Sequence, residues 1–302
     1  MKASPLQNLR SKGSRFTRDI PSRFARAFTL VELLVVLCIV ALLAATLAPT
    51  LADSRIGSQT LRCLNNNRQL AAAWRMYADD SRDRVVYASP NDSSQNNTNR
   101  IFAWATSIID FTTSTGNWDT NVDIVKQPLW SYTGKEASIY RCPSDHSYVV
   151  TGGGVVKPRV RSFAMNLFTG GFAPLPGTGP AGSDGGLAPT FRIFSKTTDI
   201  TLPGPARTFV FMDMRPDAVT YPEFLTDMAG YPNLPAQFAF YDLPGISHNL
   251  GASVSFADGR VEIRRWVDPR TAPTLNGFSG GAIPSPNNVD VAWLQARATS
   301  PK

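Results

Sequence analysis

The sequence predicts an α+β protein, with a long N-terminal helix followed by a head built on a mostly antiparallel β-sheet with long loops. Residues 28–48 form an apolar run interrupted by one charge, Glu32, and residues 53–80 continue with apolar side chains at helical spacing. Beyond Asp83 the chain changes to short β-type runs separated by Gly, Pro, Asn and Ser. This pattern lacks the alternating helices of a βαβ protein.

Basic residues are concentrated at the N-terminal end of the chain. The 302 residues have a formal net charge of +7, but residues 1–27 contain seven of the 30 basic residues and only one of the 23 acidic residues. The remaining chain is therefore close to neutral. We expect no nucleic-acid binding, because that activity requires a basic surface on the folded domain.

The apolar run at residues 28–48 is long enough to cross a membrane. At about 1.5 Å per helical residue it spans roughly the 30 Å of a bilayer core. The basic residues before it predict a cytoplasmic N-terminus by the positive-inside rule, with the head outside the cytoplasm. An ordinary signal anchor, or a signal peptide cut near Ala48, would also explain the run. Glu32 argues against both, because a carboxylate at the centre of a bilayer costs about 3 kcal/mol and usually has a function.

The residues from Arg26 to Glu32, RAFTLVE, resemble the processing site of type IV prepilins and type II secretion pseudopilins. The resemblance implies that a prepilin peptidase cuts between Ala27 and Phe28 and methylates the new N-terminus at Phe28. Ala27 stands where this family usually has glycine. Glu32 becomes the fifth residue of the mature chain, where the family's glutamate neutralises the N-terminal amine of a neighbouring subunit. The implied partners are the peptidase, other pilin or pseudopilin subunits, and inner-membrane lipid.

Pro49 follows the apolar run, where many pilins carry a proline that disturbs their long helix. Proline removes a helix hydrogen bond, so we expect a kink here, although the residue would also explain an end of the membrane helix. Residues 49–82 are predicted to form an amphipathic half of the same helix that packs against the head.

The head is assigned to residues 83–268, and it contains a long loop at 170–190 that is rich in Gly and Pro. Residues 269–302 are predicted to form a loosely attached, loop-rich tail with a short helix around Val289 to Arg297.

Residues 252–266, ASVSFADGRVEIRRW, predict a β-hairpin. Asp258 and Gly259 suit a two-residue type I′ turn, in which both central residues have positive φ. That turn pairs Phe256 with Val261 and Val254 with Ile263, and it places one face of the hairpin in the core and the other in solvent.

His248, nine intervening residues, and then Asp258 and Gly259 resemble the H-X9-DG signature of a large pilin-like family of planctomycete and verrucomicrobial type. Further blocks resemble this family at Cys63–Leu70, Trp74–Asp80, Tyr140–Asp145, Arg161–Asn166 and Phe209–Asp213. The resemblance therefore extends from about Arg26 to Trp266. It implies architecture and processing more than it implies an activity.

The sequence predicts no cofactor, and its candidates for a metal site are weak. His248 could serve as a ligand or base, but we favour a local hydrogen bond that holds the hairpin. Calcium could bind the acidic cluster Asp79, Asp80 and Asp83 at the end of the helix, although the cluster lacks a DxDxDG loop and a solvated turn is favoured. No HExxH, CxxC or Walker-type loop supports an enzyme.

The three cysteines are Cys38, Cys63 and Cys142. Outside the cytoplasm Cys63 and Cys142 could form a disulfide that ties the head to the helix, and free buried thiols are an equal alternative. Cys38 is expected to be a small apolar residue in lipid.

Three functions compete. A structural subunit of a pilus-like or pseudopilus filament accounts for the cleavage motif, Glu32 and Pro49. A membrane-anchored extracytoplasmic binding module is the second interpretation, and it would use the aromatic side chains Trp104, Trp118 and Trp130. An enzyme is the least supported.

Overall fold

The structure, a computed structural model, describes residues 29–90, 98–175, 182–183, 185–275 and 281–302, with the side chains of 44–56 outside the description. The chain divides into two compact units, Met1–Leu51 and Ala52–Lys302. The predicted leader and the cleavage site at Ala27 and Phe28 lie outside the described residues. The fold is mixed α and β with largely antiparallel sheets, as predicted.

Helix α1 spans Leu30–Asp80, 51 residues. It begins in a capping box, in which Thr29 Oγ1 accepts a hydrogen bond from Glu32 N–H at 3.2 Å and Glu32 Oε2 accepts one from Thr29 N–H at 2.9 Å. Pro49 lies inside this helix, so the interpretation in which the proline ends it is wrong. A kink at Pro49 stays a prediction.

The first unit contains the predicted membrane segment. Large apolar side chains between Leu30 and Leu43 are 47% to 79% exposed. Phe28 and the side chains of residues 44–48, which complete the predicted span, lie outside the description. Among the described residues, no helix has an apolar stretch of the length that a membrane crossing requires.

In the second unit, α1 is amphipathic, as predicted. Its buried side chains follow helical spacing at Cys63, Asn67, Leu70, Trp74 and Ala78. The helix ends at Asp80. Arg82 and Asp83 then have positive φ of 58° and 65°, and the Asp83 N–H donates to the Ala78 carbonyl at 2.9 Å. This is the left-handed cap that commonly terminates a helix.

The main sheet has five strands in the order β5-β3-β4-β7-β8. Their bounds are β3 Phe163–Asn166, β4 Phe209–Asp213, β5 Glu223–Phe224, β7 Gly251–Phe256 and β8 Val261–Arg265. The pair β3 and β5 is parallel and the other pairs are antiparallel. Two small antiparallel pairs accompany this sheet: β1 Tyr148–Val150 with β2 Val156–Pro158, and β6 Ala239–Phe240 with β9 Ile283–Pro284.

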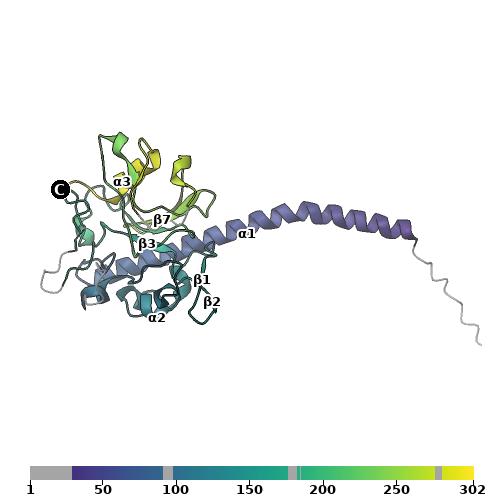
Figure 1. Cartoon of the computed structure of the whole chain (residues 1–302), viewed down its shortest axis with the longest axis horizontal. Helices are drawn as coiled ribbons and strands as arrows, with labels where there is room; N and C mark the ends of the chain where they lie inside the picture. Colours follow the sequence, from purple (N-terminus) through teal and green to yellow (C-terminus); the bar gives the residue numbers. More distant parts are fainter. Residues whose placement is uncertain (1–28, 91–97, 176–181, 184, 276–280) are drawn as a thin grey trace, which may run out of the picture. The chain divides into compact units, whose positions relative to one another are not determined.

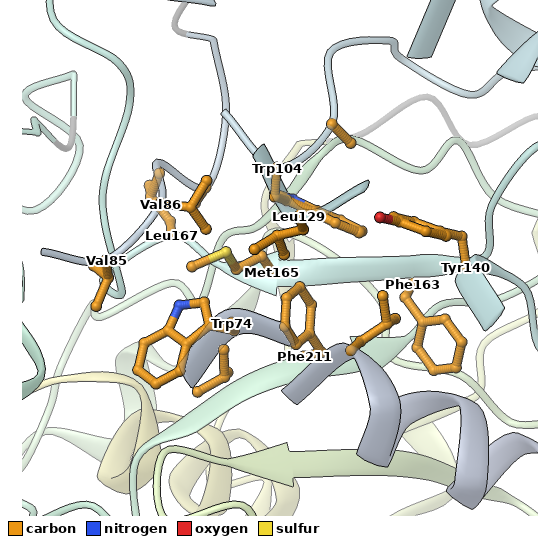
Figure 2. Packing of buried hydrophobic residues seen from close by; sticks show 14 of the residues in the cluster. Trp74, Val85, Val86, Trp104, Leu129, Tyr140, Phe163, Met165, Leu167 and Phe211 are labelled. Carbon is orange, nitrogen blue, oxygen red and sulfur yellow. The ribbon is translucent and has the colours of Figure 1, made fainter. Parts of the chain in front are cut away.

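Helices cover both faces of the five-stranded sheet (Figure 1). On one face, Leu70 and Trp74 of α1 pack with Phe163, Met165 and Phe211 (Figure 2). On the other face, helix α3, Val289–Ala298, packs against strands β4 and β7. The remaining described helices are short: α2 Thr120–Asp123 and the 3-10 turns η1 Thr98–Phe102, η2 Thr115–Asn117, η3 Pro128–Ser131, η4 Ala137–Tyr140, η5 Thr197–Asp199, η6 Pro235–Gln237 and η7 Pro269–Thr271.

The hairpin of β7 and β8 forms, but its predicted register is wrong by one residue. Ser255 pairs with Val261 and Val254 with Glu262, where the type I′ turn required Val254 opposite Ile263. Of the two predicted turn residues, only Gly259 has a positive φ, 91°, so the connection is a three-residue loop with a glycine bulge. The predicted wet face of β7 is also wrong, because all six of its residues are buried between α1 and α3.

The C-terminal residues are not loosely attached. The predicted short helix is confirmed as α3, and Val291, Leu294 and Ala298 belong to the core cluster on its face of the sheet. Asn288 caps α3 by accepting hydrogen bonds from the N–H groups of positions 290 and 291. Residues 281–302 are therefore part of the head.

Candidate functional site

Four reactive side chains meet in the buried interface between α1 and the sheet. They are Cys63 on α1, Cys142 just after η4, Asp213 at the end of β4, and His248 in the turn before β7. Their sulfur, nitrogen and oxygen atoms all lie within 4.8 Å of one another, and all four residues are buried. Among the described residues this is the one group of three or more potential metal ligands.

A β-bulge in β4 places Asp213 in this group. Phe209 pairs with Phe256 and Met212 with Val254, so the register shifts by one residue between the two pairs. The shift puts Phe211 on the α1 face and Met212 on the α3 face, and the following residue, Asp213, points to the α1 side again. Regular alternation from Phe209 would have placed this carboxylate on the opposite face.

His248 is held from both ends of its ring. Nδ1 lies 3.2 Å from Thr60 Oγ1, and Nε2 lies 3.3 Å from Cys142 Sγ and 3.6 Å from Asp213 Oδ2. The turn that carries His248 is tight, since the next two residues, at positions 249 and 250, have φ of 54° and 56°. Non-glycine residues seldom adopt this conformation, and it often occurs at functional sites.

Asp213 is oriented by the chain around it. Its Oδ1 accepts a hydrogen bond from the Ser253 N–H, which leaves Oδ2 towards His248. A Cβ at Gly245 would lie 2.5 Å from Asp213 Oδ2, so the glycine leaves room for the carboxylate. The Cys142 N–H donates to Ser162 Oγ at 2.6 Å and fixes the backbone beneath that thiol.

Burial controls the protonation of the group. It raises the pKa of Asp213 well above the ordinary value, and negative charge at Cys142 adds to this effect. Burial also raises the pKa of Cys63. The hydrogen bond from Cys63, with His248 acting in the same direction, lowers the pKa of Cys142 to about 5. Burial of Cys142 acts in the opposite direction and is outweighed. Burial opposes protonation of His248, but the hydrogen bond to Cys142 and the charge of Asp213 leave its pKa raised.

The geometry argues against a Cys-His-Asp catalytic triad. In such a triad the acid binds the ring nitrogen that faces away from the nucleophile. Here Cys142 and Asp213 both approach Nε2, while Thr60 binds Nδ1. The arrangement instead offers two other chemistries: oxidation of the two thiols to a disulfide, or coordination of a metal ion by all four groups.

The structure brings together only some of the residues that the sequence singled out. The predicted pair Cys63 and Cys142 lies in the site, and both thiols are free. The His248 side chain contacts distant segments instead of holding the hairpin, where its backbone N–H donates to the Gly251 carbonyl at 3.2 Å. Asp258 and Gly259 lie in the hairpin loop and not in the site.

The acidic candidates for calcium are exposed. Asp79, Asp80 and Asp83 do not form a ligand group among the described residues, and Asp80 accepts a hydrogen bond from the Tyr132 hydroxyl at 2.9 Å. The predicted calcium site therefore has no support in the geometry. Of the three tryptophans proposed to be exposed, Trp104 is fully buried in the core.

Sequence analysis missed Asp213 as a site residue and missed the convergence of His248 with the cysteines. The sequence does contain a sign that Asp213 has a partner, because this aspartate directly follows the apolar strand segment FVFM. A carboxylate buried there without a partner would be strongly unfavourable.

A surface hollow of about 590 Å³ adjoins the site. Cys142 lies at its wall, together with Arg62, Trp118, Arg141 and His146. Of the four residues of the site, Cys142 is the one that lines the hollow.

Comparison with known proteins finds no matching family model, no matching curated protein and no matching solved structure. The resemblance to prepilins and to the H-X9-DG family therefore rests on the motifs themselves.

Proposed function

We propose that this chain is a structural subunit of a type IV pilus-like or type II secretion pseudopilus filament, processed by a prepilin peptidase. The observation that carries the proposal is the segment from Arg26 to Glu32 at the start of the apolar run of residues 28–48. In this proposal the helix remains in the inner membrane until assembly, with its N-terminus cytoplasmic and the head outside.

The first half of α1 supports the proposal by its composition. Its described side chains are apolar around the whole circumference, except at Glu32 and Thr29. A helix that is apolar on all sides requires a covering of lipid or of other helices. In a filament the helices of neighbouring subunits supply that covering.

The second half of α1 supports it in a different way. Cys63, Leu70 and Trp74 are fully buried against the sheet, so this half belongs to the head. In the proposed filament this half of the helix connects the head to the apolar half along the chain.

Mass spectrometry of the mature N-terminus tests the processing step. We expect a chain that begins at Phe28 and carries an N-methyl group, because the peptidase acts at the cytoplasmic face and leaves the helix intact. An N-terminus near Thr50 would mean ordinary signal-peptide cleavage and would overturn the proposal.

An anchored binding module remains the second candidate because of the surface hollow, in which Arg62, Arg141 and Trp118 offer charge and an aromatic ring. Shearing of cells separates the two functions. Recovery of the chain in sheared filaments supports the subunit, whereas recovery only as detergent-extracted monomer supports the module.

A further inference from the structure

Two distances within the group of Cys63, Cys142, Asp213 and His248 match the edges of a tetrahedral metal site. Zinc lies about 2.3 Å from sulfur and about 2.0–2.1 Å from nitrogen or oxygen, so the edges of its ligand tetrahedron are roughly 3.3–3.8 Å. The distances from His248 Nε2 to Cys142 Sγ and Asp213 Oδ2 are 3.3 and 3.6 Å. The Cys63 sulfur lies within 4.8 Å of the other three donor atoms. A zinc ion at the centre requires the longer of these separations to shorten to tetrahedral edges.

The groups around the four donors orient them as the second shell of a metal site does. A metal-binding histidine usually donates its other ring N–H to a neighbouring oxygen, which selects the tautomer. Thr60 Oγ1 is in that position at Nδ1, so Nε2 is free to coordinate. Asp213 is similarly fixed through Oδ1 by the Ser253 N–H and presents Oδ2.

The burial of the group also favours a cation as its partner, because binding of a cation allows the donors to ionise. Two thiols and a carboxyl share a pocket in which Asp213 is 1% exposed and Cys63 is 0% exposed. Among the ion pairs of the described residues, the partner of Asp213 is His248 and no Lys or Arg. Buried charges without a partner are strongly unfavourable, and a divalent ion compensates the anions that the ligands form.

We propose that Cys63, Cys142, Asp213 and His248 bind one Zn²⁺ ion, which fastens α1 to the sheet of the head. Coordination releases to solvent every proton that the four donor groups still hold, so the bound state contains two thiolates, one carboxylate and a neutral imidazole. Two sulfur ligands with one nitrogen and one oxygen in a tetrahedron favour zinc over calcium or magnesium, which prefer oxygen.

Four protein ligands make the proposed site structural, because a catalytic zinc keeps one position for water or substrate. The ligands come from segments far apart in the sequence, and the ion therefore closes long loops of the chain. A disulfide between Cys63 and Cys142 would join two of the same segments, but it would leave Asp213 buried without a cation other than His248.

The test uses the full-length chain, because Cys63 belongs to α1. The chain is purified in detergent, because the first half of α1 exposes large apolar side chains. Its metal content is measured by mass spectrometry after reconstitution with zinc under reducing conditions. We expect about one zinc per chain. Cys63→Ser and Asp213→Asn should each weaken zinc binding at least about tenfold. Loss of a residue that only orients a metal ligand already costs about 10–100-fold in affinity, and loss of the ligand itself should cost at least as much. Cys38→Ser and His146→Gln are matched controls outside the group and should retain the zinc.

Cobalt provides a measurement that needs no variant. Co²⁺ bound to the wild-type chain should show the intense visible bands of tetrahedral coordination together with thiolate charge transfer, and zinc should displace it. Circular dichroism of each variant establishes whether it is folded. Two results would overturn the proposal: a reduced wild-type chain that takes up neither zinc nor cobalt, or metal-free chain from cells in which Cys63 and Cys142 are joined by a disulfide.

Discussion

Arg161 is a charged residue with no exposed side-chain surface, and an aspartate and three backbone carbonyls surround its guanidinium group. Its Nε donates to Asp123 Oδ2 at 3.0 Å, and its other nitrogens donate to the carbonyls of Phe163, Tyr221 and Ser107. Asp123 Oδ1 in turn accepts hydrogen bonds from two backbone N–H groups, those of positions 106 and 107. The pair holds the segment before β3 against α2.

Asp123→Asn should therefore destabilise the head strongly. The mutation leaves the buried guanidinium without its anion, which costs about 3–5 kcal/mol in other proteins. Denaturant unfolding of the full-length chain measures the loss. Glu262→Gln removes the partner of Arg260 in an exposed pair and should cost at most about 1 kcal/mol. Equal losses in the two variants would contradict the role assigned to burial.

Asp242 predicts a pH dependence of stability. Burial raises its pKa to about 8 from an ordinary 3.8. The hydrogen bond from the Leu225 N–H lowers the pKa by a smaller amount, and the charge of Glu223 raises it. Between these two pH values the folded chain keeps a proton that the unfolded chain has lost. The stabilisation is full below about pH 4 and is lost as the pH rises towards 8.

Asp242→Asn cannot ionise, so this variant should lose less stability than wild type between about pH 5 and pH 8. The free energy of unfolding at the two pH values gives the slope. Asp79→Asn, at an exposed position of α1, should keep the wild-type slope. An unchanged slope in Asp242→Asn would show that this carboxyl does not control the pH dependence.

At the scale of elements, the head depends on the second half of α1. Trp74 is fully buried against the sheet (Figure 2). Met76, two residues further along the same helix, is 51% exposed. Trp74→Ala should lower the free energy of unfolding by about 3–5 kcal/mol through lost burial and a new cavity. Met76→Ala should change it by no more than about 0.5 kcal/mol.

Thermal and denaturant unfolding of both variants measure this difference. If Trp74→Ala behaves like Met76→Ala, α1 is not an integral part of the head.

The β7 and β8 hairpin shows how an element can be predicted while its register is not. The two strands and their Asp-Gly connection are visible in the sequence, because alternation and turn residues are local signals. The register depends on whether the loop has two or three residues, and here packing of β7 against both helices selects the longer loop. Ser253 and Ser255 are buried as a result, where alternation with polar residues predicted exposure.

At the scale of the whole molecule, Glu32 separates filament assembly from simple anchoring. Glu32→Gln removes the charge but preserves the capping box with Thr29, since glutamine serves equally at this position. Membrane insertion should remain intact, because the segment becomes more apolar. Incorporation into filaments should fall at least about thirtyfold per contact, as expected for loss of one partner of a buried ion pair worth roughly 2–5 kcal/mol.

The measurement is the fraction of chain in sheared filaments, with equal expression and with cleavage before Phe28 verified in both proteins. Equal incorporation of wild type and Glu32→Gln would remove the assembly role of Glu32 and favour the anchored module.

The sequence by itself determined the long helix, the amphipathic character of its second half, and the α+β class of the head. Helical spacing from Cys63 to Ala78, short β-type runs after Asp83, and the helix near Val289 are local patterns, and local patterns report secondary structure. The sequence also identified Cys63, Cys142 and His248 as chemically notable residues, because cysteine and histidine are scarce in this chain.

Only the tertiary structure decided what these residues form together. A β-bulge turns Asp213 towards α1, and a strained turn brings His248 to the same place. Neither feature has a periodic signal, because the bulge depends on the pairing of β4 with β7 and the turn is a local irregularity. The attachment of the C-terminal helix could not be predicted from the sequence either. Its apolar face packs against strands that are distant in the sequence, so the contact is visible only in the folded chain.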